Sequence, residues 1–164
     1  MAVRIVTFEP RHAAGVAELI VPIQRDEFGI PITYDTQPDL RDIAGFYRRG
    51  AGEFWVALAG DDRVVGSVGL LDIGAGTDGG ALRKMFVRAD HRGRRYGVAQ
   101  ALLDALLEHA RRHGFAAVHL GTTEKFLAAH RFYEKNGFRA VPPEALPAGF
   151  PRMAVDSRFY RLDL

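Results

Sequence analysis

The sequence predicts an α/β protein, one domain with a mixed β-sheet flanked by helices. The chain has 164 residues, of which 48% are apolar, enough for one domain with a proper core. Some apolar runs alternate with the period of a strand, and others recur at helical spacing. The expected elements follow the order β-α-α-β-β-β-α-β-α-β-β, which packs most simply as one sheet between helices. We therefore expect a single domain over residues 1–164.

The N-terminal part begins with a strand and two helices. Residues 3–8 alternate as a strand, and Pro10 suits the start of a helix over 11–20. Residues 21–38 contain three prolines and predict a long loop with room for one helical turn. Residues 39–47 predict a second, short helix. Long loops in compact domains are often functional, which draws attention to residues 21–38.

The middle of the chain predicts a hairpin, a strand and the longest helix. Apolar runs at 54–58 and 63–71 flank a Gly-Asp-Asp turn and predict a β-hairpin. A glycine-rich turn at 74–80 leads into a strand over 81–87. Residues 97–113 give the strongest helix signal, because their leucines form one apolar stripe.

The C-terminal part predicts three short strands and a helix. Residues 116–120 predict a buried strand, and residues 124–135 predict a helix that ends at Asn136-Gly137. Residues 138–141 and 158–162 predict two final strands, joined by a proline-rich loop.

Composition narrows the function. The formal net charge of +2 is too small to indicate nucleic-acid binding by itself. The chain has no cysteine, which excludes disulfides and a thiol nucleophile and fits a cytoplasmic location. No apolar run approaches the roughly 20 residues that cross a bilayer, so no membrane partner is expected. No His, Asp and Glu cluster has convincing ligand spacing, so no metal is expected either.

The basic loop before the long helix is a candidate anion site. A helix N-terminus presents unpaired N–H groups and a partial positive charge, and Gly97 lets a ligand approach the backbone. The segment matches neither a Walker loop nor a dinucleotide fingerprint. From the residues alone, a phosphate site and a solvated basic surface are equally good interpretations. The basic residues of this segment are Arg83, Lys84, Arg88, Arg92, Arg94 and Arg95.

Two motifs bring a family into view. The segment Arg94-Arg95-Tyr96-Gly97-Val98-Ala99 resembles the Arg/Gln-x-x-Gly-x-Gly/Ala motif of the GNAT superfamily of N-acetyltransferases. The later segment Ala-His-Arg-Phe-Tyr-Glu-Lys-Asn-Gly-Phe, residues 129–138, resembles the second signature of that superfamily. The resemblance is clearest over residues 82–138, and the element order extends it more loosely over the chain.

The resemblance implies a fold and an activity. Two neighbouring parallel strands would splay apart and hold acetyl-CoA between them. The primary amine of a small molecule or a protein would then attack the thioester directly and receive the acetyl group. No metal would take part. The family often forms homodimers through a sheet edge. A non-catalytic domain that senses acyl-CoA is the alternative. By position, the residues expected to contact acetyl-CoA are Met85, Phe86, Val87, Arg92, Gly93, Arg94, Arg95, Tyr96, Gly97, Val98, Ala99, Ala129, Phe132 and Lys135.

The family also implies a role for Tyr133. A phenol with an ordinary pKa near 10 is protonated at neutral pH and can donate a proton to the departing CoA thiolate. The alternative is that Tyr133 only packs. Many relatives carry a glutamate base where Ala81 stands, and an asparagine where Phe126 stands. We therefore expect no base at Ala81 and no amide contact to CoA at Phe126.

Several residues remain as candidates around the site. Substitutes for the missing base are weak, and His119 is expected to be a core histidine with satisfied ring nitrogens. The loop over 31–35 is the better candidate for the acceptor site. A set of aromatic candidates could form an acceptor pocket instead, but these residues are expected in the core. Those aromatic candidates are Phe54, Trp55, Phe159, Tyr160 and the stretch 150–153, and the weak substitutes for the base are Glu27, Asp35, Asp72, His119 and Glu124.

Overall fold

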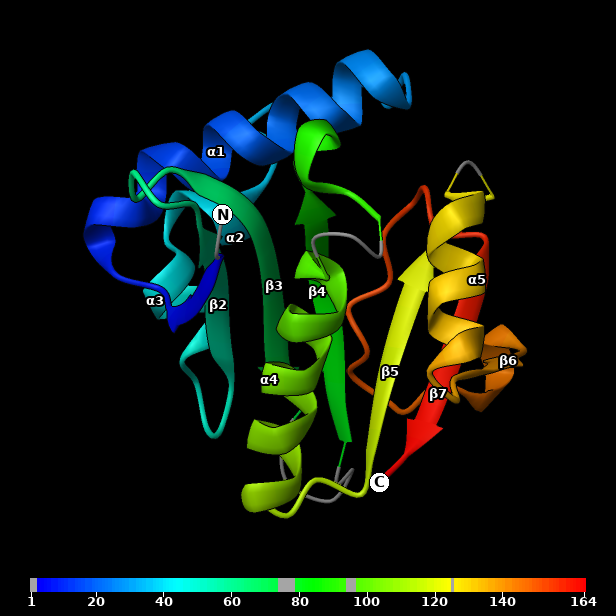
Figure 1. Ribbon diagram of the computed structural model, residues 1–164. Helices are drawn as coiled ribbons and strands as arrows, with labels where there is room; N and C mark the ends of the chain where they lie inside the picture. The colour runs from blue at the N-terminus through cyan, green and yellow to red at the C-terminus, as the bar shows by residue number, and fades with distance from the viewer. Residues whose placement is uncertain (1–2, 74–78, 94–96, 125) are drawn as a thin grey trace.

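The computed structural model describes residues 3–73, 79–93, 97–124 and 126–164, which form a seven-stranded sheet with helices on both faces (Figure 1). The strand order is β1-β2-β3-β4-β5-β7-β6. The β4–β5 pair is parallel, and the other adjacent strands in this order pair antiparallel. The expected α/β class and mixed sheet are confirmed. The strands are β1 (Arg4–Thr7), β2 (Glu53–Leu58), β3 (Val64–Asp72), β4 (Gly79–Val87), β5 (Ala117–Thr122), β6 (Arg139–Val141) and β7 (Arg158–Asp163). The α-helices are α1 (Ala13–Pro22), α2 (Pro38–Arg41), α3 (Ile43–Tyr47), α4 (Val98–Arg112) and α5 (Leu127–Lys135).

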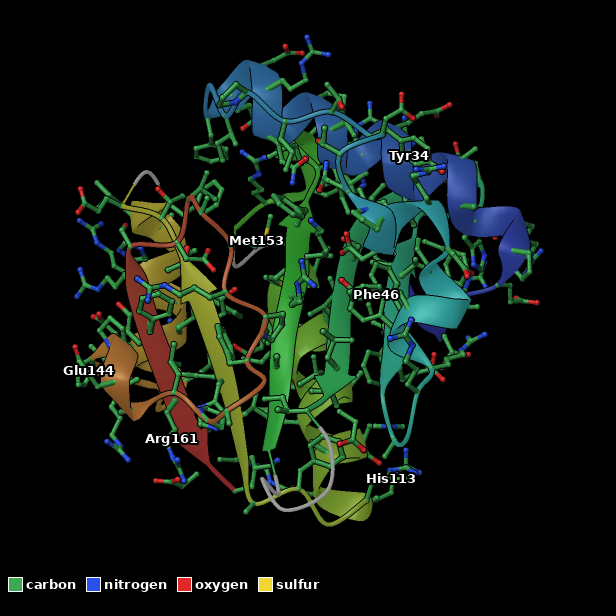
Figure 2. The ribbon with its side chains drawn as sticks, turned by 180° about the vertical axis from the view of Figure 1, so that it is seen from behind. Tyr34, Phe46, His113, Glu144, Met153 and Arg161 are labelled. Carbon is green, nitrogen blue, oxygen red and sulfur yellow. The ribbon has the colours of Figure 1, made fainter. Side chains whose placement is uncertain are left out.

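Two apolar clusters fix the layers. On one face, the leucine stripe of α4 packs with Val65 and Val68 of β3 and with Tyr133 of α5. On the other face, α1 and α3 pack against Phe54 and Val56 of β2. Figures 1 and 2 show these layers from opposite sides, with α4 and α5 in front in the first view and α2 and α3 in front in the second.

The parallel strands β4 and β5 part after a short contact. They pair only between residues 79–81 of β4 and 117–119 of β5. Beyond these positions the two strands diverge, as Figure 1 shows. The splayed pair expected from the resemblance is therefore present.

The first helix is longer than the sequence predicts. A π-helical turn over Ile23–Glu27 continues α1, so the expected loop over 21–38 begins only after Glu27. The prediction was wrong because Pro22 takes helical angles, with φ −61° and ψ −37°, that suit continuation. The wider turn is closed by Phe28 N, which donates to Ile23 O at 3.3 Å.

The expected second helix is split into two. Asp42 leaves the helical region, with φ −149° and ψ 73°, and separates α2 from α3. Its side chain accepts a hydrogen bond from Gly45 N at 3.0 Å and so starts α3 anew. The break leaves Asp39 of α2 buried, where its carboxylate accepts a hydrogen bond from Tyr47 of α3.

Candidate active site

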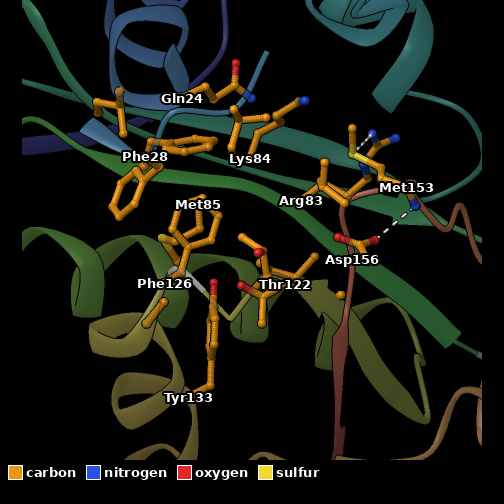
Figure 3. A pocket seen from close by; sticks show the side chains of 18 of the residues that line it. Gln24, Phe28, Arg83, Lys84, Met85, Thr122, Phe126, Tyr133, Met153 and Asp156 are labelled. Atoms are coloured by element: carbon orange, nitrogen blue, oxygen red, sulfur yellow. Dashed lines mark hydrogen bonds between the residues drawn. The ribbon is translucent and has the colours of Figure 1, made fainter. Parts of the chain in front are cut away.

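A cavity of about 420 Å³ opens where β4 and β5 separate (Figure 3). Its walls come from both strands, from α5, from the segment around residues 28–32 and from residues 150–156. Rings of Phe28, Phe86 and Phe126 form an apolar wall, and Phe28 meets Phe126 edge to face at 4.4 Å between centroids. Arg83 and Asp156 mark a charged end. The cavity therefore has an apolar wall and a charged end.

Tyr133 reaches the cavity from α5. Tyr133 is 5% exposed, and its ring packs edge to face on the ring of Phe138. Figure 3 shows the side chain extending from the helix toward Met85 and Thr122. Burial raises the pKa of the Tyr133 phenol well above its ordinary value of 10. The hydroxyl is thus a neutral donor at neutral pH, and no hydrogen bond to it is found within the described part of the chain.

Several of the expected cofactor residues meet at this cavity. Met85, Phe86 and Val87 line it from β4, and Ala129 lines it from α5. Phe132 instead packs against the core beside Tyr133, with ring centroids 5.6 Å apart. Lys135 is exposed at the end of α5 and is not among the cavity residues. Contact of any of these residues with acetyl-CoA stays a prediction.

Arg92 lines the cavity but its guanidinium already has partners. Nη1 and Nη2 donate to the two carboxylate oxygens of Glu27 at 2.6 and 2.9 Å. Nε donates to Val87 O at 2.8 Å. This fork ties the end of β4 to the π-helical turn, so a role for Arg92 at the pyrophosphate requires the ion pair to be exchanged. Glu27, a weak candidate for the base, is held in the same pair.

The start of α4 has the geometry of an anion site. Gly97 caps the helix with φ 63°, a left-handed conformation that favours glycine. A Cβ on Gly97 would meet no described atom within 4 Å. Gly93, with φ 96°, is exposed, whereas Val98 is buried and Ala99 half-buried. The expected contacts of Arg94, Arg95 and Tyr96 lie outside the described residues.

A bulge in β4 builds the charged end, and sequence reasoning missed it. The pairing of β3 with β4 shifts between Ser67 and Gly69, and Lys84 has φ 56°. Ser67 Oγ donates to Lys84 O at 2.7 Å and holds the bulge. Strict alternation would place Arg83 and Lys84 on opposite faces, but both reach Asp39 of α2, at 3.9 and 3.6 Å.

Lys84 is a buried cation with a compact set of partners. Its side chain is 4% exposed, and Nζ donates to Gln37 Oε1 at 2.6 Å. Asp39 in turn accepts a hydrogen bond from Tyr47 Oη at 2.6 Å. Burial lowers the pKa of Lys84 to about 8, against the opposing pull of Asp39. At neutral pH the ammonium form still predominates.

The histidine on β5 departs from its expectation. His119 is 2% exposed, and its Nδ1 has no hydrogen-bond partner within the described residues. The expectation of satisfied ring nitrogens is therefore wrong. Burial lowers the pKa of His119, which favours the neutral ring at neutral pH.

The candidate acceptor segments divide between core and cavity. Phe54, Trp55, Phe159 and Tyr160 are buried in the core, as expected. The stretch over 150–153 was expected there too, but Phe150, Pro151 and Met153 line the cavity. Figure 2 shows this loop at Met153. The loop has neither helical nor strand periodicity, so the sequence pattern does not predict where it lies in the fold. Of the expected acceptor loop over 31–35, Ile32 lines the cavity.

Two further properties concern metals and membranes. Among the described residues, no group of three or more His, Asp and Glu side chains is placed to hold a metal ion. No helix in the described ranges is both long and apolar enough to cross a membrane.

Comparisons with known proteins agree with this geometry. The profile of the acetyltransferase (GNAT) family matches residues 17–138. The N-acetylaspartate synthetase of Rattus norvegicus is 39% identical over 102 residues, which cover 62% of this chain and 33% of the relative. The chain thus spans about a third of the length of that relative.

Solved structures extend the likeness over the whole chain. A GNAT-family acetyltransferase from Staphylococcus aureus Mu50 is 34% identical with a TM-score of 0.93, and the match covers 99% of both chains. An N-acetylglutamate synthase from Neisseria gonorrhoeae, solved with coenzyme A and N-acetyl-glutamate, has a TM-score of 0.77 at 17% identity. That match covers 100% of this chain and 35% of the synthase, and at this identity it shows a shared fold.

Proposed function

Because the chain belongs to the GNAT acetyltransferase family, we propose that it transfers an acetyl group from acetyl-CoA to a small primary amine that carries a carboxylate. The cavity between the splayed strands carries this proposal. It combines an apolar wall, a neutral phenol donor and a charged end in one cavity.

The cofactor end is supported by the unpaired edge of β4 and by the start of α4. Beyond Ala81, the β5-facing edge of β4 is released from the parallel ladder. The peptide groups of this edge at Met85 then suit the amides of a pantetheine arm, whereas Val87 O already accepts a hydrogen bond from Arg92 Nε. A helix start such as that of α4 suits a pyrophosphate, because the first N–H groups of a helix generally lack an acceptor within it.

Tyr133 has the chemistry of the acid in this reaction. The amine attacks the thioester carbonyl, and the tetrahedral species expels CoA as a thiolate. The thiolate needs a proton, and Tyr133 offers a protonated hydroxyl at the cavity wall.

The acceptor is proposed to carry a carboxylate because the bulge brings two cations to the charged end of the cavity. Arg83 lines the cavity with a side chain that is 14% exposed, and Lys84 lies beside it. Arginine binds carboxylates through paired N–H groups, which gives both affinity and orientation. The name of the rat relative, an N-acetylaspartate synthetase, supports the same class of acceptor.

A release assay for free CoA thiol tests the proposal. Acetyl-CoA is combined with L-aspartate or L-glutamate, and in parallel with the side-chain amides L-asparagine and L-glutamine as matched neutral acceptors. We expect turnover with an acidic amino acid to exceed that with its amide by at least tenfold. Equal or better turnover with the amides would contradict the acceptor class, and no release with any amine would contradict the activity.

An arginine variant sharpens the assay. Arg83→Met keeps a long apolar stem but loses the paired donors. A hydrogen bond to a charged group is worth about 1.5–3 kcal/mol, so the Michaelis constant for the acidic acceptor should rise by about tenfold to a hundredfold. The Michaelis constant for its amide should change little. An equal rise for both acceptors would remove Arg83 from acceptor recognition.

A further inference from the structure

A carboxylate stands in the cavity on the side opposite β4. Asp156 belongs to the loop that precedes β7, and its half-buried side chain lines the cavity. Oδ2 accepts a hydrogen bond from Met153 N at 3.0 Å, which fixes the carboxylate (Figure 3). No hydrogen bond to Oδ1 is found among the described residues. One oxygen is therefore anchored and the other remains available to a ligand.

Strand β5 makes room for this carboxylate with a glycine. A Cβ on Gly121 would lie 2.6 Å from Asp156 Oδ2 and 2.9 Å from its Cγ. Distances this short are forbidden, so no other residue at 121 leaves Asp156 where it is. Gly121 and Thr122 also line the cavity, which places the carboxylate in the same space as Tyr133.

We propose that Asp156 is the base that takes the proton from the acceptor's ammonium group. On β4, Ala81 stands where many relatives carry a glutamate base. The inference rests on the proposed function. Ala81 is fully buried in the β4–β5 contact and carries no proton acceptor. Two other titratable groups near this end are already engaged. Lys84 is mostly protonated at neutral pH and is bonded to Gln37. Asp39 is buried and accepts a hydrogen bond from Tyr47 Oη.

The proton balance of the reaction is complete with these groups. The ammonium N–H bond breaks, and its proton joins Asp156 to give a neutral amine and a carboxylic acid. The amine nitrogen then bonds to the acetyl carbonyl carbon, and the carbon–sulfur bond breaks. Tyr133 gives its proton to the departing thiolate and recovers one from the new amide nitrogen. Asp156 finally releases its proton to solvent, so one proton leaves per turnover.

The surroundings of Asp156 suit this role. Burial raises the pKa of its carboxyl above the ordinary value of 3.8, and so strengthens it as a base. Three cations face it and oppose that rise, namely Arg83 and Lys84 from β4 and Arg152 from its own loop. The same cations would hold the carboxylate of the acceptor, while its ammonium group turns toward Asp156.

The test compares two nucleophiles in one variant. In Asp156→Asn, the amide oxygen still accepts from Met153 N, so the loop keeps its anchor while the base is lost. L-Aspartate enters as an ammonium ion and needs a base, whereas hydroxylamine, a much weaker base, is largely neutral in the assay. Initial rates of CoA release are measured for both across pH, after subtraction of the uncatalysed reaction. Asp163→Asn serves as a control, because that carboxylate is exposed and pairs with Arg161.

The expected result separates the base from a structural role. With L-aspartate, kcat/KM of Asp156→Asn should fall by about 10²–10⁴, and the acidic limb of its pH profile should disappear. With hydroxylamine, the variant should stay within a few fold of the parent, and Asp163→Asn should match the parent with both nucleophiles.

Three outcomes would overturn the inference, and they are distinguishable. Equal losses with the two nucleophiles would make Asp156 a support of the loop. An unchanged rate and pH profile in an active enzyme would leave it without a role as base. A parent protein that releases no CoA with either nucleophile would overturn the proposed function, and the base with it.

Discussion

Replacing Tyr133 by phenylalanine separates chemistry from packing at the centre of the cavity. The ring of Tyr133 packs among Phe132, Phe138 and Tyr160, and these contacts survive in Tyr133→Phe. The hydroxyl has no hydrogen-bond partner among the described residues. Its removal should therefore lower the free energy of unfolding by less than about 1 kcal/mol. If the hydroxyl protonates the thiolate, the turnover number should fall by about 10²–10⁴, nearer the low end because a thiolate leaves readily.

Tyr160 supplies a matched control, because its hydroxyl is bonded but not placed at the cavity. Tyr160 Oη donates to Glu134 Oε2 at 2.6 Å, and the Glu134 side chain is 49% exposed. Solvent screening reduces the value of that bond, so Tyr160→Phe should cost about 1 kcal/mol of stability. In a domain of this size that change lowers Tm by about 2–4 °C. Its turnover number should be unchanged.

The assay pairs thermal unfolding with initial rates of CoA release at saturating acetyl-CoA. The Michaelis constant for acetyl-CoA should move little in Tyr133→Phe, because the lost interaction is strongest in the transition state. An unchanged turnover number in Tyr133→Phe, with chemistry limiting the rate, would refute the acid role. A fall of several degrees in its Tm would refute the statement that the hydroxyl is unbonded.

Three further predictions use other parts of the site. Arg94→Ala or Arg95→Ala should weaken CoA binding by about tenfold to a hundredfold in calorimetry, while pantetheine, which lacks the diphosphate, should bind as before. The lowered pKa of Lys84, about 8 against 10.5 when unfolded, means that the unfolded state binds more protons between these values. The free energy of unfolding should therefore rise with pH from about 8 toward 9.5, by at most about 1.4 kcal/mol per unit, and Lys84→Met should abolish the rise in urea titrations. Gly121→Ala should displace Asp156 and lower turnover with L-aspartate far more than with hydroxylamine, and equal rates would contradict the placement of that carboxylate.

Periodicity predicted the fold well wherever local pattern decides structure. The α4 stripe and the hairpin of β2 and β3 came from regular spacing of apolar residues, and both were confirmed. Residues 23–27 were missed because a proline interrupts the pattern, and the wider π-helical turn that accommodates it has no sequence signature.

Only the part of the cavity that the motif residues line was predictable from the sequence. Motif residues such as Met85 and Tyr133 lie at the cavity because the motifs are local. The charged half depends on contacts between distant segments. Lys84 reaches the charged end of the cavity because of a bulge, and Asp156 belongs to a loop that follows β5 by more than thirty residues. Neither placement follows from spacing along the chain.

Carbon-13 NMR of labelled acetyl-CoA tests the central claim most directly. The acetyl carbonyl carries the label, and the protein is mixed with the labelled thioester and L-aspartate. The account predicts that the thioester signal disappears while an amide carbonyl signal of N-acetylaspartate grows in equal amount. A label that stays on the thioester, or that emerges as free acetate, would contradict transfer to a carboxylate-bearing amine.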